Sequence, residues 1–170
     1  GDAGMGKTTL VQALLEEVDS EAVECVLVSH PTLSPAEFYE LLAGQFHLSP
    51  AAAASKTQFL LELRQRLLER RAEGKISAIL VDEAQCMSFE LLEEVRLLSN
   101  CETPTEKLLN VVLSGQPELA QRLNEPSLRQ LKQRVSLRCE LKPFDFADTA
   151  SYIAGRLRIA GGEPEQIFTR

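Results

Sequence analysis

The sequence predicts an α/β fold in which helices cover a mainly parallel β-sheet. Three observations lead to this prediction. The chain opens on a glycine-rich loop followed directly by a helical pattern. Short apolar runs then alternate with amphipathic helical stretches along the 170 residues. The central runs are apolar on both faces, which is typical of strands that are buried in a parallel sheet.

The opening loop, GDAGMGKTT at residues 1–9, fits the pattern G-x-x-x-x-G-K-[ST]. Its glycines allow successive N–H groups to point at phosphate oxygens, and the helix that follows presents its positive end. We expect Lys7 to reach the β- and γ-phosphates of a nucleotide and the Thr8 hydroxyl to ligate Mg²⁺. The residues expected to contact the nucleotide are Gly1, Gly4, Met5, Gly6, Lys7, Thr8 and Thr9.

This motif normally follows a β-strand, whereas residue 1 already belongs to the loop. We therefore expect the sequence to be a fragment cut at its N-terminus, with the missing first strand in the middle of the sheet. An open sheet centre with unpaired strand edges would favour aggregation.

Hydrophobic periodicity and turn residues place the elements that follow. Strands are predicted at 24–30, 76–81, 109–115 and 135–141. Helices are predicted at 8–18, 34–46, 57–74, 88–100, 116–123, 126–134 and 144–162, with another beginning at 163–170. Residues 51–56 are interpreted as a small-residue connection. Ser34 is the expected N-cap of one helix, with Glu37 completing a capping box; Asp145 and Gly161 are expected to cap and end the helix at 144–162.

Composition is that of an ordinary globular domain, with 44% hydrophobic and 25% charged residues. No apolar run approaches 18 residues, so no transmembrane helix is predicted. The net charge of −7 weakens a simple nucleic-acid-binding interpretation. None of the four cysteines forms C-x-x-C, which favours reduced thiols, with Cys25 and Cys139 expected in buried strands.

The second motif is VDEAQ, which ends the predicted strand at 76–81. A carboxylate at this position lies beside the phosphate loop in such sheets, so Asp82 is expected to hold Mg²⁺ through water. Glu83 would point differently and could orient or deprotonate the water that attacks the γ-phosphate. The alternative is an acidic pair on the surface at a strand end.

Glu83 also separates classes of nucleotide-binding protein. A small-molecule kinase must keep water away from the γ-phosphate, and a GTPase would show an N-K-x-D-like guanine reader, which this sequence lacks. ATP hydrolysis is therefore the better inference.

Polar residues follow the predicted strand at 109–115. Ser114 and Gln116 could contact the γ-phosphate or the attacking water, or could form an ordinary polar turn. Further on, Arg129, Lys132 and Arg134 precede the last predicted strand. An arginine there could reach into the site of a neighbouring subunit, as arginine fingers do, or could be a surface charge.

The order and spacing of GDAGMGKTT, VDEAQ, VRLLSN, LLNVVLSGQPEL, LRQLKQRV and YIAGRLRIAGG resemble the AAA+ ATPase domain of the general secretion pathway protein A (ExeA-like) family. The resemblance covers essentially all 170 residues. Its first two motifs are generic to many ATPases, whereas RLLSN followed by GQPEL and QRV is more specific. His30 and Cys86 stand where asparagine is usual in that family, which leaves the subfamily open.

The resemblance implies an AAA+ P-loop NTPase with a five-stranded parallel sheet and a small helical lid. The core would span 1–142 and the beginning of the lid 143–170. Gln116 would be a sensor and Arg134 a finger that acts on the neighbouring protomer, so that, with Glu83, three residues would be catalytic. Further residues receive no catalytic role: Arg96 and Asn100 would lie near the site, and Arg156 and Arg158 are left as packing or surface residues.

The resemblance also implies ATP and Mg²⁺ as cofactors and a homo-oligomer with shared active sites. Members of the family face the cytoplasm at the bacterial inner membrane and use ATP to help assemble the secretin of a secretion system, which suggests a membrane-protein partner. Two alternatives stay open: a DNA-transposition regulator ATPase that oligomerises on DNA, and a slow ATP-dependent switch that acts as a scaffold.

Overall fold

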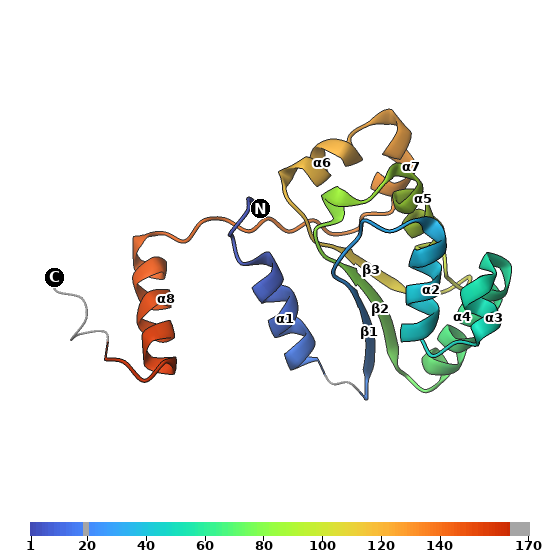
Figure 1. Ribbon diagram of the computed structural model, residues 1–170, viewed down its shortest axis with the longest axis horizontal. Helices are drawn as coiled ribbons and strands as arrows, with labels where there is room; N and C mark the ends of the chain where they lie inside the picture. Colours follow the sequence, from blue (N-terminus) through green and yellow to red (C-terminus); the bar gives the residue numbers. More distant parts are fainter. Residues whose placement is uncertain (19–20, 164–170) are drawn as a thin grey trace. The chain divides into compact units, whose positions relative to one another are not determined.

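A computed structural model describes residues 1–18 and 21–163 of the chain. These residues belong to two compact units, one at 1–139 and one from residue 140 onward (Figure 1). The first unit holds the sheet and both sequence motifs. The second contains a single described helix. The helix expected to begin at 163–170 lies almost entirely outside the described residues.

The first unit is built on a parallel sheet of three strands with the order β1-β2-β3. The strands are β1 (Val23–Val28), β2 (Ile76–Val81) and β3 (Asn110–Leu113). The last residues of the strands are in register, because Val28 pairs with Val81 and Val81 pairs with Leu113. The segments that leave the carboxyl ends of β2 and β3 therefore begin side by side, as the predicted site requires.

Helices flank the sheet on both faces. Figure 1 shows α1 on one side of the sheet and α2, α4 and α5 on the other. The helices of the first unit are α1 (Lys7–Glu17), α2 (Pro35–Gln45), α3 (Pro50–Ala54), α4 (Lys56–Ala72), α5 (Phe89–Leu98), α6 (Pro117–Leu123) and α7 (Arg129–Lys132). Two short 3₁₀ turns complete it, η1 (Ala84–Cys86) and η2 (Pro126–Leu128).

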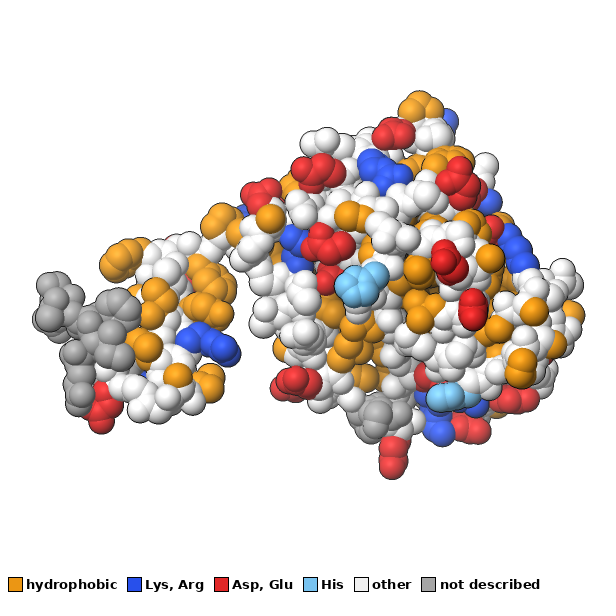
Figure 2. All heavy atoms as spheres, viewed as in Figure 1, with side chains coloured by type: hydrophobic (Ala, Val, Ile, Leu, Met, Phe, Trp, Pro, Cys, Tyr) orange, Lys and Arg blue, Asp and Glu red, His pale blue; other side chains and the backbone are white. Residues whose placement is uncertain are grey.

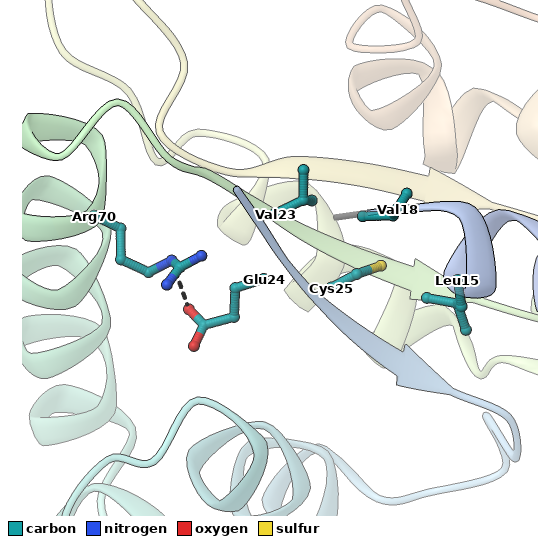
Figure 3. A pocket seen from close by; sticks show the side chains of 6 residues that line it. All are labelled: Leu15, Val18, Val23, Glu24, Cys25 and Arg70. Atoms are coloured by element: carbon teal, nitrogen blue, oxygen red, sulfur yellow. Dashed lines mark ion pairs between the residues drawn. The ribbon is translucent and has the colours of Figure 1, made fainter. Parts of the chain in front are cut away.

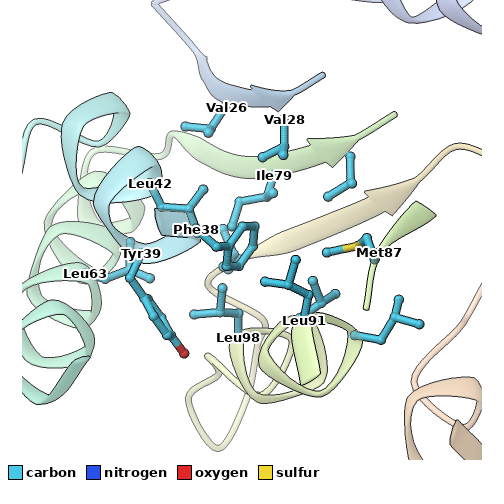
Figure 4. Close-up of a cluster of buried hydrophobic side chains, with 14 of the residues drawn as sticks. Val26, Val28, Phe38, Tyr39, Leu42, Leu63, Ile79, Met87, Leu91 and Leu98 are labelled. Carbon is cyan, nitrogen blue, oxygen red and sulfur yellow. The ribbon is translucent and has the colours of Figure 1, made fainter. Parts of the chain in front are cut away.

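The main hydrophobic core lies between the sheet and the helices α2, α4 and α5 (Figure 4). Alternate β-strand residues such as Val28 and Ile79 point into it, in accordance with the two-residue period of a strand. Phe38 and Leu91 meet them from the helices and are fully buried. Packing in this core holds the sheet, and therefore the carboxyl ends of its strands, in one position.

The predicted capping box of α2 is confirmed. The Ser34 N–H donates to Glu37 Oε2 at 2.8 Å, and the Glu37 N–H donates to Ser34 Oγ at 3.3 Å. In the second unit, α8 (Phe146–Ile159) begins as expected, because the Asp148 N–H donates to Asp145 Oδ1 at 2.8 Å. Gly161 follows the helix with a φ of 81°, a left-handed conformation that suits glycine.

The predicted strand at 135–141 is wrong. A strand needs a neighbour in register, and no described strand pairs with this segment or with the second edge of β3. The Val135 N–H instead donates to the Lys132 carbonyl at 3.1 Å. Leu137 is 78% exposed, and Cys139, expected to be buried, is exposed. The sheet of the described residues therefore has three strands, and the expected number of five is not confirmed.

The predicted connection at 51–56 is also wrong in part, because α3 occupies most of it. The Ala52 N–H donates to Ser49 Oγ at 3.3 Å, and Pro50 takes the first helical position. Alanine has the highest helix propensity, so a capped run of four alanines forms a helical turn. In the described part of the chain, no helix is long and apolar enough to cross a bilayer.

Candidate functional site

The loop before α1 has the backbone that the glycine motif predicts. Gly4 and Gly6 have φ values of 76° and 81°, in the left-handed region that L-residues with a Cβ rarely adopt. Gly6 is the residue before the first turn of α1, and no side chain caps this helix. The N–H groups of the first turn, which include those of Thr8 and Thr9, are therefore available to an anion.

Lys7 lies at the centre of the loop. Its residue is only 8% exposed, and its Nζ donates to the carbonyls of Gly1 at 2.9 Å and Asp2 at 2.7 Å. The ammonium group is thus folded over the loop and held by backbone oxygens. Phosphate oxygens that entered the loop could replace these carbonyls, because they are stronger acceptors for a charged donor.

The phosphate loop and the acidic motif meet through Thr8 and Asp82. Thr8 Oγ1 donates to Asp82 Oδ2 at 2.7 Å across a sequence separation of 74 residues. Asp82 is 5% exposed, and its other oxygen accepts the Glu83 N–H at 3.0 Å. The sequence predicted that these two residues lie together, and the structure places them in direct contact.

The environment of Asp82 keeps it ionised. Burial alone would raise the pKa of its carboxyl group, but hydrogen bonds from Thr8 and Ser114 and the nearby charge of Lys7 oppose this and leave the pKa below its usual value. A buried carboxylate beside a threonine hydroxyl is a suitable set of donors for Mg²⁺, which takes oxygen ligands and keeps several waters. No cluster of three or more acidic, histidine or cysteine side chains that could hold a metal occurs in residues 1–18 and 21–163.

Glu83 directly follows Asp82 and has an unusual backbone. Its φ of 51° and ψ of 39° lie in the left-handed region, which is uncommon for a residue other than glycine. Its Oε2 accepts hydrogen bonds from the side-chain amides of Gln85 and of Gln116, the latter at 3.2 Å. The structure therefore brings together Glu83 and Gln116, two residues that the sequence predicts to be catalytic.

Sequence reasoning missed three residues that shape this site. Gln85 contacts both Glu83 and Gln116, and Arg122 Nη1 donates to the carbonyl of Gln85 at 2.7 Å. Gly115 lies against Gln85, since an added Cβ would come within 2.8 Å of Gln85 Oε1. The only signal in the sequence was the glutamine that ends VDEAQ, because contacts between two loops leave no local periodicity.

Arg134 lies elsewhere on the first unit. Its Nη1 is 3.8 Å from Glu102 Oε1, and its side chain is 42% exposed. It lines a cavity of about 410 Å³ together with Arg96, Gln130 and Gln133. Among the described contacts, none joins Arg134 to the phosphate loop or to the acidic motif, so its role as a finger toward a neighbouring protomer stays a prediction.

A second cavity, of about 250 Å³, lies at the other end of the sheet (Figure 3). It is lined by residues at the beginning of β1 and the end of α1, and by the ion pair of Glu24 with Arg70 at 3.1 Å. The cavity lies at the amino end of β1, whereas the candidate site lies at the carboxyl ends of β2 and β3, where parallel sheets bind their ligands. The cavity and the candidate site are therefore separate.

Comparison with known proteins identifies the family of the chain. A family model described as an AAA domain matches residues 1–123, which is more than two thirds of the chain. The chain belongs to this AAA family. Its sequence is also 41% identical over 170 residues to General secretion pathway protein A of Aeromonas hydrophila. That match covers 99% of this chain and 30% of the relative, and it confirms the predicted resemblance.

Solved structures show the same fold at low sequence identity. The ORC2 protein of Aeropyrum pernix, in its ADPNP–ADP complexes, matches with a TM-score of 0.67 and 15% identity over 94% of this chain and 44% of that one. Cdc6p of Pyrobaculum aerophilum matches with a TM-score of 0.66 and 18% identity over 94% of this chain and 42% of that one. These matches show the fold, and together with the family model they establish the AAA+ P-loop class that the sequence predicts, a class that binds nucleotides.

Proposed function

We propose that this AAA domain binds ATP together with Mg²⁺ and hydrolyses the bond between the β- and γ-phosphates, which releases ADP and phosphate. The observation that supports this most is the 2.7 Å hydrogen bond from Thr8 Oγ1 to Asp82, because it joins the phosphate loop to the acidic strand end. Glu83 lies next to this contact in the chain and is held by two amide donors. A Mg²⁺ ligand pair and an adjacent carboxylate are the parts that ATP hydrolysis requires.

The residues of the chain have distinct roles in this proposal. The loop at 4–9 binds the phosphates through its N–H groups, and Lys7 exchanges two backbone carbonyls for phosphate oxygens. Thr8 and Asp82 hold Mg²⁺, which neutralises charge on the β- and γ-phosphates when bound. Binding does not need a new fold, because both ligands already lie within 2.7 Å of each other.

Glu83 acts as the group that orients or deprotonates the attacking water. Gln116, whose side-chain amide already reaches Glu83, contacts the γ-phosphate or the water and acts as a sensor. Arg134 is proposed to stabilise developing charge in the site of a neighbouring protomer. Its exposure, and its contact with Glu102 rather than with the phosphate loop or the acidic motif, suit a residue that acts outside its own subunit.

We infer further that the ATPase works in the assembly of a secretion system at the cytoplasmic face of the bacterial inner membrane, with a membrane protein as partner. This rests on the 41% identity to General secretion pathway protein A, of which the chain spans 30%. A DNA-dependent regulator of transposition is the alternative. It receives less support from the net charge of −7 and from the face in Figure 2, where acidic and basic side chains are interspersed without a broad basic area.

Two substitutions test the enzymatic part. Glu83→Gln should bind ATP with unchanged affinity and lose turnover, whereas normal turnover would exclude Glu83 as the group acting on water. Arg134→Ala should lose turnover at unchanged affinity. Arg71→Ala is its matched control, because Arg71 is also 42% exposed and paired with a glutamate, yet lies on α4.

The specific ATPase rate measured against protein concentration, with and without DNA, tests the assembly part. A rate per protomer that rises with concentration and ignores DNA supports a shared active site and the secretion-type function. A rate that stays low until DNA is added, and falls again with salt, supports the DNA-dependent alternative.

A further inference from the structure

The loops that follow β2 and β3 are joined by the side chain of Gln85. Its Nε2 donates to Glu83 Oε2, and its Oε1 accepts the backbone N–H of Gln116 at 3.1 Å. The side chain of Gln116 returns to the same Glu83 oxygen at 3.2 Å. Three residues from two loops therefore form a closed ring of hydrogen bonds around one carboxylate.

The orientation of the Gln85 amide is fixed by its partners. A carboxylate oxygen accepts hydrogen bonds and does not donate them, so the atom facing Glu83 must be the donor Nε2. The Gln116 N–H can only donate, so the atom facing it must be Oε1. A flipped amide would lose both hydrogen bonds. No other side-chain type of this length offers a neutral donor and an acceptor in this geometry.

The surroundings keep Gln85 in place from two further sides. Arg122 Nη1, from α6, donates to the carbonyls of Gln85 at 2.7 Å and Met87 at 2.6 Å, which fixes the backbone of η1. At Gly115, a Cβ would meet Gln85 Oε1 at 2.8 Å and Leu119 Cδ2 at 3.0 Å. The missing side chain at this position is therefore what lets Gln85 approach the β3 loop.

We propose that Gln85 is a positioning residue that sets the direction of the Glu83 carboxylate and links it to the loop at 114–116. This rests on the proposed role of Glu83 in hydrolysis. Gln85 touches neither phosphate nor metal in this proposal. Because it bonds Glu83 at one end and the Gln116 backbone at the other, a shift of the β3 loop moves the carboxylate with it.

Under this proposal, removing the Gln85 side chain should lower the rate of ATP hydrolysis without changing the affinity for ATP. The phosphate loop and Asp82 do not bond to Gln85 through any described contact, so ATP affinity should not depend on this side chain. The reach of Glu83 toward water should depend on it, and a misplacement of about 1 Å can lower a rate by about 100-fold.

The test compares Gln85→Met, which keeps the length and removes both hydrogen bonds, with Gln65→Met. Gln65 also donates to a glutamate, Glu69, at 2.7 Å, but on the exposed face of α4. In the full natural chain, Gln85→Met should lower kcat by about 10- to 100-fold and leave the ATP dissociation constant within about twofold. Without nucleotide, the Gln116 amide should exchange with deuterium about fivefold faster or more, because it has lost its acceptor. Gln65→Met should change none of these.

Combining Gln85→Met with Glu83→Gln gives the second measurement. If Gln85 acts through Glu83, it should alter the residual turnover of the Glu83→Gln variant by less than about twofold. An equal loss in both backgrounds would overturn the proposal, as would an unchanged kcat or an unchanged exchange rate at Gln116. Normal turnover of Glu83→Gln alone would instead overturn the proposed function on which the inference rests, and the exchange measurement keeps the two failures apart.

Discussion

Replacing Gly6 by alanine tests whether the backbone conformation at one position determines if the substitution raises or lowers the free energy of unfolding. The φ of Gly6 is 81°, and an added Cβ would meet no heavy atom within 4 Å, so alanine there is strained although space is available. Gly44 lies inside α2, where φ is ordinary and a Cβ also meets nothing within 4 Å. The same substitution at the two positions should therefore have opposite effects.

The magnitudes follow from the two conformations. Alanine in the left-handed region costs about 1–2 kcal/mol, so Gly6→Ala should lower the free energy of unfolding by about that amount. Alanine inside a helix is better than glycine by about 0.5–1 kcal/mol, so Gly44→Ala should raise it. Since the two changes have opposite signs, the free energies of unfolding of the two variants should differ by about 1.5–3 kcal/mol.

Urea unfolding of both variants, with the slope of free energy against denaturant checked for constancy, measures this gap. The strain appears only once. A loop that keeps its left-handed backbone lowers the free energy of unfolding, whereas a loop that relaxes lowers the affinity for ATP instead, by about 5- to 30-fold, because binding restores that backbone. A rise in stability for Gly6→Ala equal to that for Gly44→Ala would refute the reasoning, because the folded loop would then not require this φ.

Two further predictions concern the core and the pH dependence of stability. Phe59→Ala should lower the free energy of unfolding in urea by about 3–5 kcal/mol, because the ring is fully buried. Leu61→Ala on the same helix should change it by less than about 0.5 kcal/mol, because Leu61 is 62% exposed. Similar losses at both positions would contradict the packing of α4. Burial, together with a hydrogen bond to Glu94 and its charge, raises the pKa of Tyr39. The folded protein thus holds this proton more tightly than the unfolded chain, so stability should be full below pH about 10 and fall as pH rises beyond it. In Tyr39→Phe, this loss of stability with rising pH should be absent. Urea midpoints measured between about pH 8 and 11 test this, and the reasoning is wrong if the midpoint falls with pH as steeply in Tyr39→Phe as in the unchanged protein.

The elements that sequence alone predicted are those with a local physical cause. The box formed by Ser34 and Glu37 lies within a single helical turn, so four residues suffice to identify it. The strands before Asp82 and Ser114 are short, apolar and bounded by polar residues, which is a pattern readable without the fold. The pairing of Thr8 with Asp82 was predictable because the motif carries its own geometry.

The errors and omissions have non-local causes. Residues 135–141 alternate in polarity as a strand does, but a strand exists only where a neighbour accepts its hydrogen bonds, and this depends on the whole sheet. The contact of Gln85 with Gln116 joins loops 31 residues apart. The left-handed backbone of Glu83 is likewise imposed by its surroundings, since glutamate has no preference for it.

The 74 residues that separate Thr8 from Asp82 also affect the order in which the protein becomes competent during its synthesis. At roughly 5–20 residues per second, a ribosome adds Asp82 about 4–15 s after Thr8. Throughout that interval the phosphate loop has neither its acidic partner nor the completed strands β2 and β3. A nucleotide can therefore bind to the complete site only after β2 and β3 have been synthesised. The chain length at which ATP begins to protect the nascent protein from proteolysis would therefore show when the sheet is complete.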